Sequence, residues 1–140
     1  MQKKHPSKVS YPLYLAVISI INAPMLIDLF QNEPTNLGWE LTFVVVLTTF
    51  ITYLFFFTSY TIVNDSLVIK SGFFSEKIAI SKIKEIQKTN NILSAPAPSF
   101  NRILVKYGKF DEVIISPKNK RQFVNDLLAV NSGIINKLDN

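Results

Sequence analysis

The segment LTFVVVLTTFITYLFFFTSY, residues 41–60, contains no charged residue, and its only polar groups are hydroxyls. Those hydroxyls can bond to carbonyl oxygens one helical turn earlier, so lipid would leave none of them unpaired. As an α-helix the segment would be about 30 Å long, which matches the hydrocarbon core of a bilayer. The segment therefore predicts a membrane-spanning helix.

A second apolar run precedes it at residues 12–30 and predicts another spanning helix of about 28 Å. Pro24 removes one backbone donor, and Asp28 lies near the end of the run, where an interface lowers its cost. Aromatic side chains flank the two runs, as in the aromatic belts of membrane proteins: Tyr11, Tyr14, Trp39 and Tyr60. The alternative is a cleaved signal peptide, but no Ala-x-Ala-like site follows the run.

The distribution of lysines predicts the orientation of this hairpin. Lys3, Lys4 and Lys8 precede the first run, and further lysines follow the second, whereas the connection at residues 31–40 carries only Glu33 and Glu40. Positively charged flanks stay in the cytoplasm. We therefore expect a multi-pass protein of the cell membrane, with residues 1–11 as a cytoplasmic tail, residues 12–60 as a two-helix hairpin and residues 61–140 as a cytoplasmic domain.

Composition argues against catalysis and cofactors. The 140 residues include no cysteine, which excludes disulfides, thiolate chemistry and Cys-ligated metals. The only histidine, His5, lies in the expected mobile tail without a partner nearby in the sequence, and the acidic residues are scattered. No glycine-rich phosphate loop is present. We expect no enzyme, no metal and no cofactor. The net charge of +5 is not accompanied by a stacking motif of aromatics, so nucleic acid is not an expected partner.

Residues 61–140 alternate apolar and polar side chains over short runs separated by turn residues, which predicts β-strands. Strands at 60–63, 67–70 and 76–80 would form a three-stranded meander through turns at 64–66 and 71–72. Residues 84–89 favour a strand over a helical turn. Residues 102–107 and 112–116 predict a hairpin around Gly108 and Lys109.

A C-terminal helix follows, with Ser116 as the expected N-cap, Pro117 at the first helical position, and a stripe formed by Phe123, Leu127 and Val130. The predicted fold is a membrane α-helical hairpin followed by an α+β domain, in which a small antiparallel sheet or barrel is capped by the C-terminal helix. This is the shape of a pleckstrin-homology-like (PH-like) domain, although the pattern also fits other small α+β folds.

Residues 60–128 contain a series of short motifs in this order: Ser94-Ala95-Pro96-Ala97, Ser99, Arg102, Tyr107-Gly108, Ile115-Ser116-Pro117 and Phe123. In these motifs the segment resembles the bacterial PH family found at the cytoplasmic end of short membrane anchors, which includes the immunity protein against the bacteriocin sublancin. One departure is Asn101, where the family leads us to expect an acidic residue. The resemblance implies a fold more than an activity, with these motif residues in structural roles: Ser94, Pro96, Ala97, Ser99, Arg102, Tyr107, Gly108, Ser116 and Pro117.

Two interpretations remain open for the segment from Ser94 to Arg102. It is a stiff connection whose Arg102 donates to backbone carbonyls of the turn, or a rigid rim that recognises an extended peptide by strand addition.

Three cations, Lys118, Lys120 and Arg121, are expected in the first turn of the final helix, where they oppose the helix dipole. An anion bound by these side chains and the free helix amides would explain them, for example a lipid phosphate. The alternative is that they are solubilising charges beside anionic lipid.

The predicted function is a non-enzymatic, membrane-anchored binding or scaffold module. Its expected partners are membrane lipid and a membrane protein or peptide, with no prediction of oligomeric state. Bacteriocin self-immunity is the alternative that the resemblance implies, and a small membrane enzyme is a third, weaker one.

Overall fold

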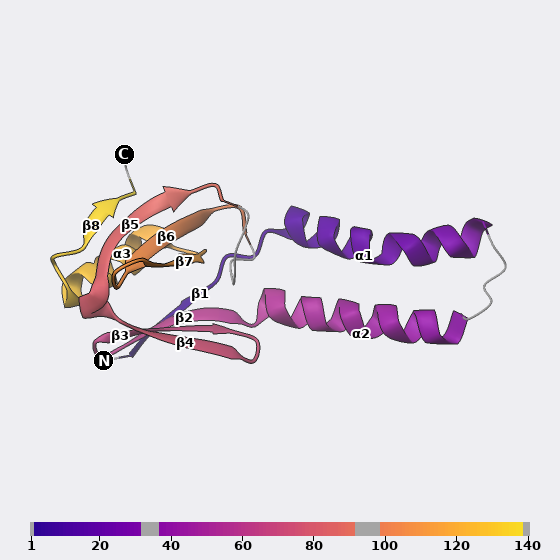
Figure 1. Cartoon of the computed structure of the whole chain (residues 1–140), viewed down its shortest axis with the longest axis horizontal. Helices are drawn as coiled ribbons and strands as arrows, with labels where there is room; N and C mark the ends of the chain where they lie inside the picture. The colour runs from indigo at the N-terminus through magenta and orange to yellow at the C-terminus, as the bar shows by residue number, and fades with distance from the viewer. Residues whose placement is uncertain (1, 32–36, 92–98, 139–140) are drawn as a thin grey trace.

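A computed structural model describes residues 2–31, 37–91 and 99–138 of the chain. Two helices form a hairpin, and a β-rich domain lies at one end of it (Figure 1). Helix α1 spans Tyr11–Gln31 and helix α2 spans Leu37–Phe56. They lie side by side in opposite directions, with the Tyr14 hydroxyl 3.0 Å from Thr52 Oγ1.

Both helices are long and apolar enough to span a membrane, over Tyr11–Phe30 and Gly38–Phe56. None of the residues in these spans is buried within the protein. A core helix of a soluble protein would bury such a surface. Instead, both helices expose large apolar side chains around their circumference, such as Ile20, Phe30 and Val46.

The first sheet is antiparallel, with the strand order β1-β2-β3-β4. Its strands are β1 (Gln2–Pro6), β2 (Thr58–Val63), β3 (Ser66–Ser71) and β4 (Phe74–Ala79). The turns between β2, β3 and β4 contain Asn64 at φ 50° and Gly72 at φ 57°, two residue types that tolerate a left-handed backbone. The predicted meander is confirmed.

The second sheet has the order β7-β6-β5-β8 and is reached through a short 3₁₀ helix, η1 (Ile80–Lys82). Its strands are β5 (Ile83–Thr89), β6 (Arg102–Tyr107), β7 (Asp111–Ile115) and β8 (Ile135–Lys137). Strand β8 pairs parallel to β5, so this sheet is mixed, not purely antiparallel. The described strands form two separate sheets and no closed barrel.

One core joins the two sheets and helix α3 (Lys120–Val130). Its largest fully buried side chains include Tyr60 from β2, Ile86 from β5, and Phe123 and Leu127 from α3. The fold is therefore apolar helices, then largely antiparallel sheets, then a C-terminal helix, as predicted for a PH-like domain.

Two boundaries near the helical hairpin differ from the predictions. Helix α2 ends at Phe56, and residues expected at its end instead form β2, because β2 pairs with β3 along its whole length. Tyr60 is therefore fully buried in the core and does not belong to an aromatic belt. The expected N-terminal tail is also wrong for residues 2–6, which form β1 against β2.

The start of α3 differs as well. Asn119, not Ser116, is the N-cap, and its side chain accepts a hydrogen bond from the Gln122 amide at 3.2 Å. Residues before the cap stay extended because they pair with the chain after β1: the Lys8 amide donates to Ser116 O at 2.7 Å. Pro117 therefore lies before the helix, in an isolated bridge with Ser7.

Candidate functional site

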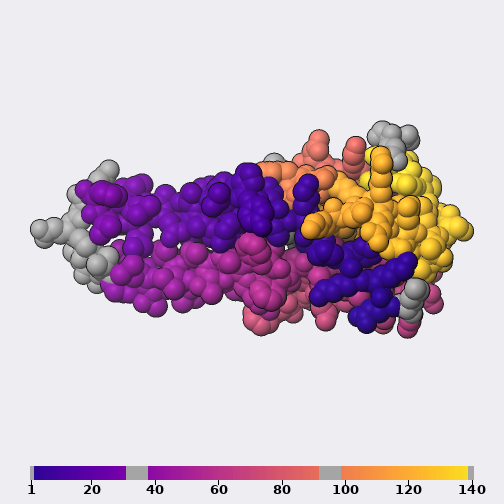
Figure 2. All heavy atoms as spheres, turned by 180° about the vertical axis from the view of Figure 1, so that it is seen from behind, coloured from indigo at the N-terminus to yellow at the C-terminus, as the bar shows by residue number. Residues whose placement is uncertain are grey.

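An open hollow of about 950 Å³ lies between β1 and the start of α3. The Lys118 amide donates to Pro6 O at 3.0 Å, and this hydrogen bond holds the two segments alongside one another. Seen from behind, the N-terminal residues lie directly against α3 (Figure 2). We call this hollow the basic groove, and it is lined by Lys3, Lys4, His5, Pro6, Lys88, Asn101, Lys118, Asn119, Lys120, Arg121, Gln122, Asp126 and Leu138.

The basic groove has a strong excess of positive charge. Six of its lining residues are lysine or arginine, and Asp126 is the only acidic one among the described residues. The three cations singled out from the sequence, Lys118, Lys120 and Arg121, lie together here. The fold adds Lys3 and Lys4 from β1 and Lys88 from β5, which are distant in the sequence.

Lys120 is one of two partly buried cations in the groove, with Lys3. Its ammonium donates to the Arg102 carbonyl at 3.0 Å. Burial, and then the charges of Lys88 and Lys8, lower the pKa of Lys120. The charges of Lys88 and Lys8 thus act on the Lys120 ammonium, and an anion beside that ammonium would relieve the repulsion.

The helix amides contribute less to this site than the sequence suggests. The Gln122 amide is already bonded to the Asn119 side chain, and the Phe123 amide donates to Asn119 O at 3.0 Å. Only Lys120 and Arg121 lie within the first turn, because Lys118 precedes the helix. An anion in the groove would therefore be held mainly by side chains.

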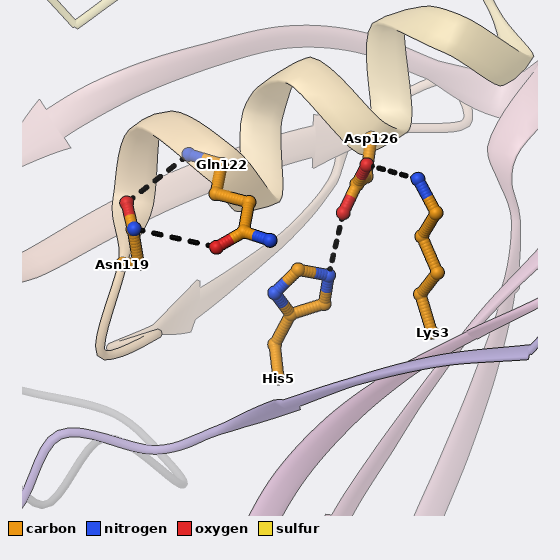
Figure 3. Close-up of polar contacts among 5 residues, drawn as sticks. All are labelled: Lys3, His5, Asn119, Gln122 and Asp126. Carbon is orange, nitrogen blue, oxygen red and sulfur yellow. Dashed lines mark hydrogen bonds and ion pairs between the residues drawn. The ribbon is translucent and has the colours of Figure 1, made fainter.

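Asp126 joins the helix to the N-terminal strand (Figure 3). It forms an ion pair with Lys3, and its Oδ2 lies 3.1 Å from His5 Nε2. Neither of these last two atoms makes a hydrogen bond among the described residues, so their contact is an ion pair only when His5 is protonated. The His5 ring also packs edge-on against Phe123, with 5.2 Å between centroids.

Sequence reasoning missed this cluster. His5 was expected in a mobile tail and Asp126 was one of the scattered acidic residues, yet His5 is buried and Asp126 is mostly covered. No apolar alternation marks the strand QKKHP, so its pairing with β2 could not be anticipated. The single histidine, next to lysines in the strand, was the only local feature that could have indicated this cluster.

Two family models, both described as Bacterial PH domain, match the chain over residues 58–131 and residues 13–91. Each match covers more than half of the 140 residues. The chain belongs to the bacterial PH domain family. Searches of the curated proteins and of the solved structures found no match.

The second match begins inside α1 and ends after β5. The pattern of this bacterial PH domain family therefore includes both apolar helices as well as the first strands of the β domain. This match is continuous from within α1 to the end of β5, whereas the other match covers residues 58–131, from β2 to the end of α3.

Arg102, one of the motif residues, donates hydrogen bonds to two backbone carbonyls. It is buried, and its Nε donates to Ser99 O at 2.5 Å while Nη1 donates to Asn91 O at 3.2 Å. The Ser99 hydroxyl in turn accepts from the Asn101 amide at 3.2 Å. Ser94, Pro96 and Ala97 lie outside the described residues.

The other motif residues of the bacterial PH domain join its parts. The Tyr107 hydroxyl donates to Glu76 at 2.7 Å, which links the two sheets and raises the pKa of Tyr107 to about 12. Gly108 adopts φ 59° in the β6–β7 turn. Ser116 and Pro117 are buried, and the Ser116 amide donates to the Tyr60 hydroxyl at 3.1 Å.

Proposed function

We propose that this bacterial PH domain is a non-enzymatic binding module, anchored at the cytoplasmic face of the cell membrane, whose basic groove binds phosphate groups of anionic lipids. The observation that carries the proposal is the convergence of six basic side chains from separate segments on one groove. Each Lys or Arg near an anionic surface gains about 1 kcal/mol.

The position of Lys8 supports a groove that opens toward the lipid surface. Lys8 precedes the start of α1 by three residues, and its charge acts on Lys120. If α1 spans the bilayer, Lys8, Lys88 and Lys120 lie close to the headgroups. This position favours a lipid over a soluble ligand.

Catalysis has little support from the His5–Asp126 contact. The carboxylate is already neutralised by Lys3, and His5 packs against Phe123. Among the described residues no hydroxyl group hydrogen-bonds to the imidazole, so no nucleophile is activated there. Bacteriocin self-immunity rests on the family resemblance alone.

The orientation can be tested with single cysteines, because the chain has none of its own. Gly38→Cys, at the end of α2 away from the β domain, should react with a membrane-impermeant maleimide in intact cells. Lys109→Cys, in the exposed β6–β7 turn, should react only after lysis. Labelling in the opposite order would contradict cytoplasmic termini.

The groove can be tested by thermal unfolding of the full chain in detergent. Dihexanoyl phosphatidylglycerol at about 100 times its Kd should stabilise the folded state by about 2.7 kcal/mol. For a domain of this size, that corresponds to a rise in melting temperature of about 10 °C or more. The neutral phosphatidylcholine of equal chain length should not produce this rise.

The triple variant Lys118→Ala, Lys120→Ala, Arg121→Ala should lose the response. The matched control changes three exposed lysines outside the groove, Lys82, Lys84 and Lys109, to Ala and removes the same charge. It should keep the response. An equal loss in both variants would mean that only net charge matters. A response to inorganic phosphate as strong as that to the lipid would point to a soluble ligand.

A further inference from the structure

The turn between β3 and β4 exposes two phenylalanines at the end of a hairpin. Phe73 is 81% exposed and Phe74 is 73% exposed. Exposed apolar side chains that gather in one place mark contact surfaces, whereas single ones need no explanation. We call residues 71–74 the aromatic tip.

The aromatic tip is fixed against the end of α2 that carries the β domain (Figure 1). The Gly72 amide donates to Phe57 O at 3.2 Å, and the hydroxyls of Ser71 and Thr58 lie 3.1 Å apart. Gly72 packs so closely that a Cβ atom there would lie 2.8 Å from Leu54 Cδ2. The tip therefore has a defined position relative to the helix.

The rings extend this contact along the helix. The Phe73 ring lies 5.1 Å from the Tyr53 ring, which itself stacks on Phe57 at 4.7 Å. Tyr53 precedes the last residue of α2 by three positions, or about 5 Å of helix. Phe73 thus lies beside the last turn of the apolar helix and not beyond it.

Charge placement around the tip also fits a membrane interface. Lys70 is exposed and pairs with Ser75. This pair is the next one along the hairpin from the pair of Ser71 and Phe74 at the turn. Its long side chain can keep its ammonium among phosphates while the rings lie deeper. Aromatic side chains flanked by lysine are typical of segments that lie in the interface.

We propose that the aromatic tip inserts into the lipid–water interface of the leaflet that faces the β domain, as a third membrane contact beside α1 and α2. This inference rests on the proposed function, in which α1 and α2 span the bilayer. Two adjacent helices alone would let the domain tilt about their common base. A third contact, displaced to one side, fixes the tilt of the domain relative to the lipid surface.

The chain contains a matched control for this inference. The β6–β7 turn also has a glycine with positive φ, Gly108, followed by an exposed ring, Phe110, which is 87% exposed. No described contact joins Phe110 to α1 or α2, and the β6–β7 turn lies at the end of the domain away from these helices (Figure 1). A comparison of Phe73 with Phe110 therefore separates the effect of exposure from the effect of a position beside α2.

The test uses three single-cysteine variants of the full chain: Phe73→Cys, Phe110→Cys and Val46→Cys, the last in the middle of α2. Each is spin-labelled in vesicles of phosphatidylcholine and phosphatidylglycerol, and its accessibility to oxygen and to a water-soluble nickel complex is measured. The oxygen-to-nickel ratio should be high at 46, low at 110 and intermediate at 73, several times above the value at 110. Phe74→Cys repeats the measurement if Phe73→Cys fails to fold.

The outcomes separate the two proposals. A lipid-like ratio at 46 with a water-like ratio at 73 and at 74 would overturn the interfacial tip and leave the membrane spans intact. A water-like ratio at 46 would overturn the spans and the tip together. Shielding of position 73 from both reagents would assign the tip to a protein contact, either a second copy or another partner, and would also overturn the inference.

Discussion

A chain that lacks residues 1–6 should melt about 10 to 20 °C below the full chain. Removal of β1 takes away the strand paired to β2 and leaves Asp126 without Lys3 and His5. A mostly covered carboxylate that loses its cation is costly, and we expect a total loss of about 3 kcal/mol. The measurement is the thermal transition of β-sheet circular dichroism in detergent.

A substitution at Asp126 separates the contribution of the ion pair to stability from that of the rest of the strand. Asp126→Asn should destabilise the full chain but have much less effect in the truncated chain, because its partners are already gone. Lys4→Ala, an exposed side chain on the same strand, should change stability by less than about 0.5 kcal/mol. Equal melting temperatures for the truncated and full chains would show that β1 does not pair in solution.

Strand β1 also decides how the proposed function must be studied. A domain that begins near residue 60 would lack Lys3 and Lys4. It would also lack Pro6, whose carbonyl accepts the hydrogen bond from the Lys118 amide. One wall of the basic groove would then be missing. Failure of such a fragment to bind lipid would therefore not count against the groove.

The strands that could be predicted are those whose own side chains carry the pattern. The β2–β3–β4 meander combines alternating apolar residues with Asn64 and Gly72 at the turns, so local chemistry and tertiary packing agree. The hairpin of β6 and β7 follows for the same reason. Helices α1 and α2 were predicted from length and apolarity, except for the boundary after Phe56, where TSYTIV suits a helix end and a strand alike.

Strands β1 and β8 depend on partners that are distant in the sequence. Backbone hydrogen bonds to β2 and β5 hold them, and their side chains are mainly polar. The Ser116–Pro117 pair imitates a helix start, but these residues stay extended because they bond to Ser7 and Lys8. A local signal was overruled here by a tertiary contact.

The candidate site divides in the same way. Lys118, Lys120 and Arg121 were recognisable because three cations close to a helix start conflict with its dipole. The groove that gathers them with Lys3, Lys4 and Lys88 arises only when β1 folds onto the domain. The role of Arg102 as a donor to carbonyls was predicted and is confirmed by its bonds to Ser99 and Asn91.

Substitution of Arg102 by lysine should destabilise the domain nearly as much as substitution by alanine. The guanidinium donates through two different nitrogens to two carbonyls that lie eight positions apart in the sequence. A lysine has one ammonium on a flexible stem and cannot reproduce this planar fork. Each hydrogen bond from a charged donor is worth about 1.5 to 3 kcal/mol, so a loss of about 3 kcal/mol is expected.

Thermal unfolding of the full chain checks this expectation, with Arg121→Lys as the matched control. Arg121 is exposed, and the same substitution there should change stability by less than about 0.5 kcal/mol. Hydrogen exchange should speed up in Arg102→Lys at the start of β6, because the carbonyls of Ser99 and Asn91 lose the group that holds both to this strand. If Arg102→Lys melted like the wild type, charge alone would suffice at this position and the fork geometry would be unimportant. If the exchange rates rose throughout both sheets instead, the arginine would support the whole core and not this connection in particular.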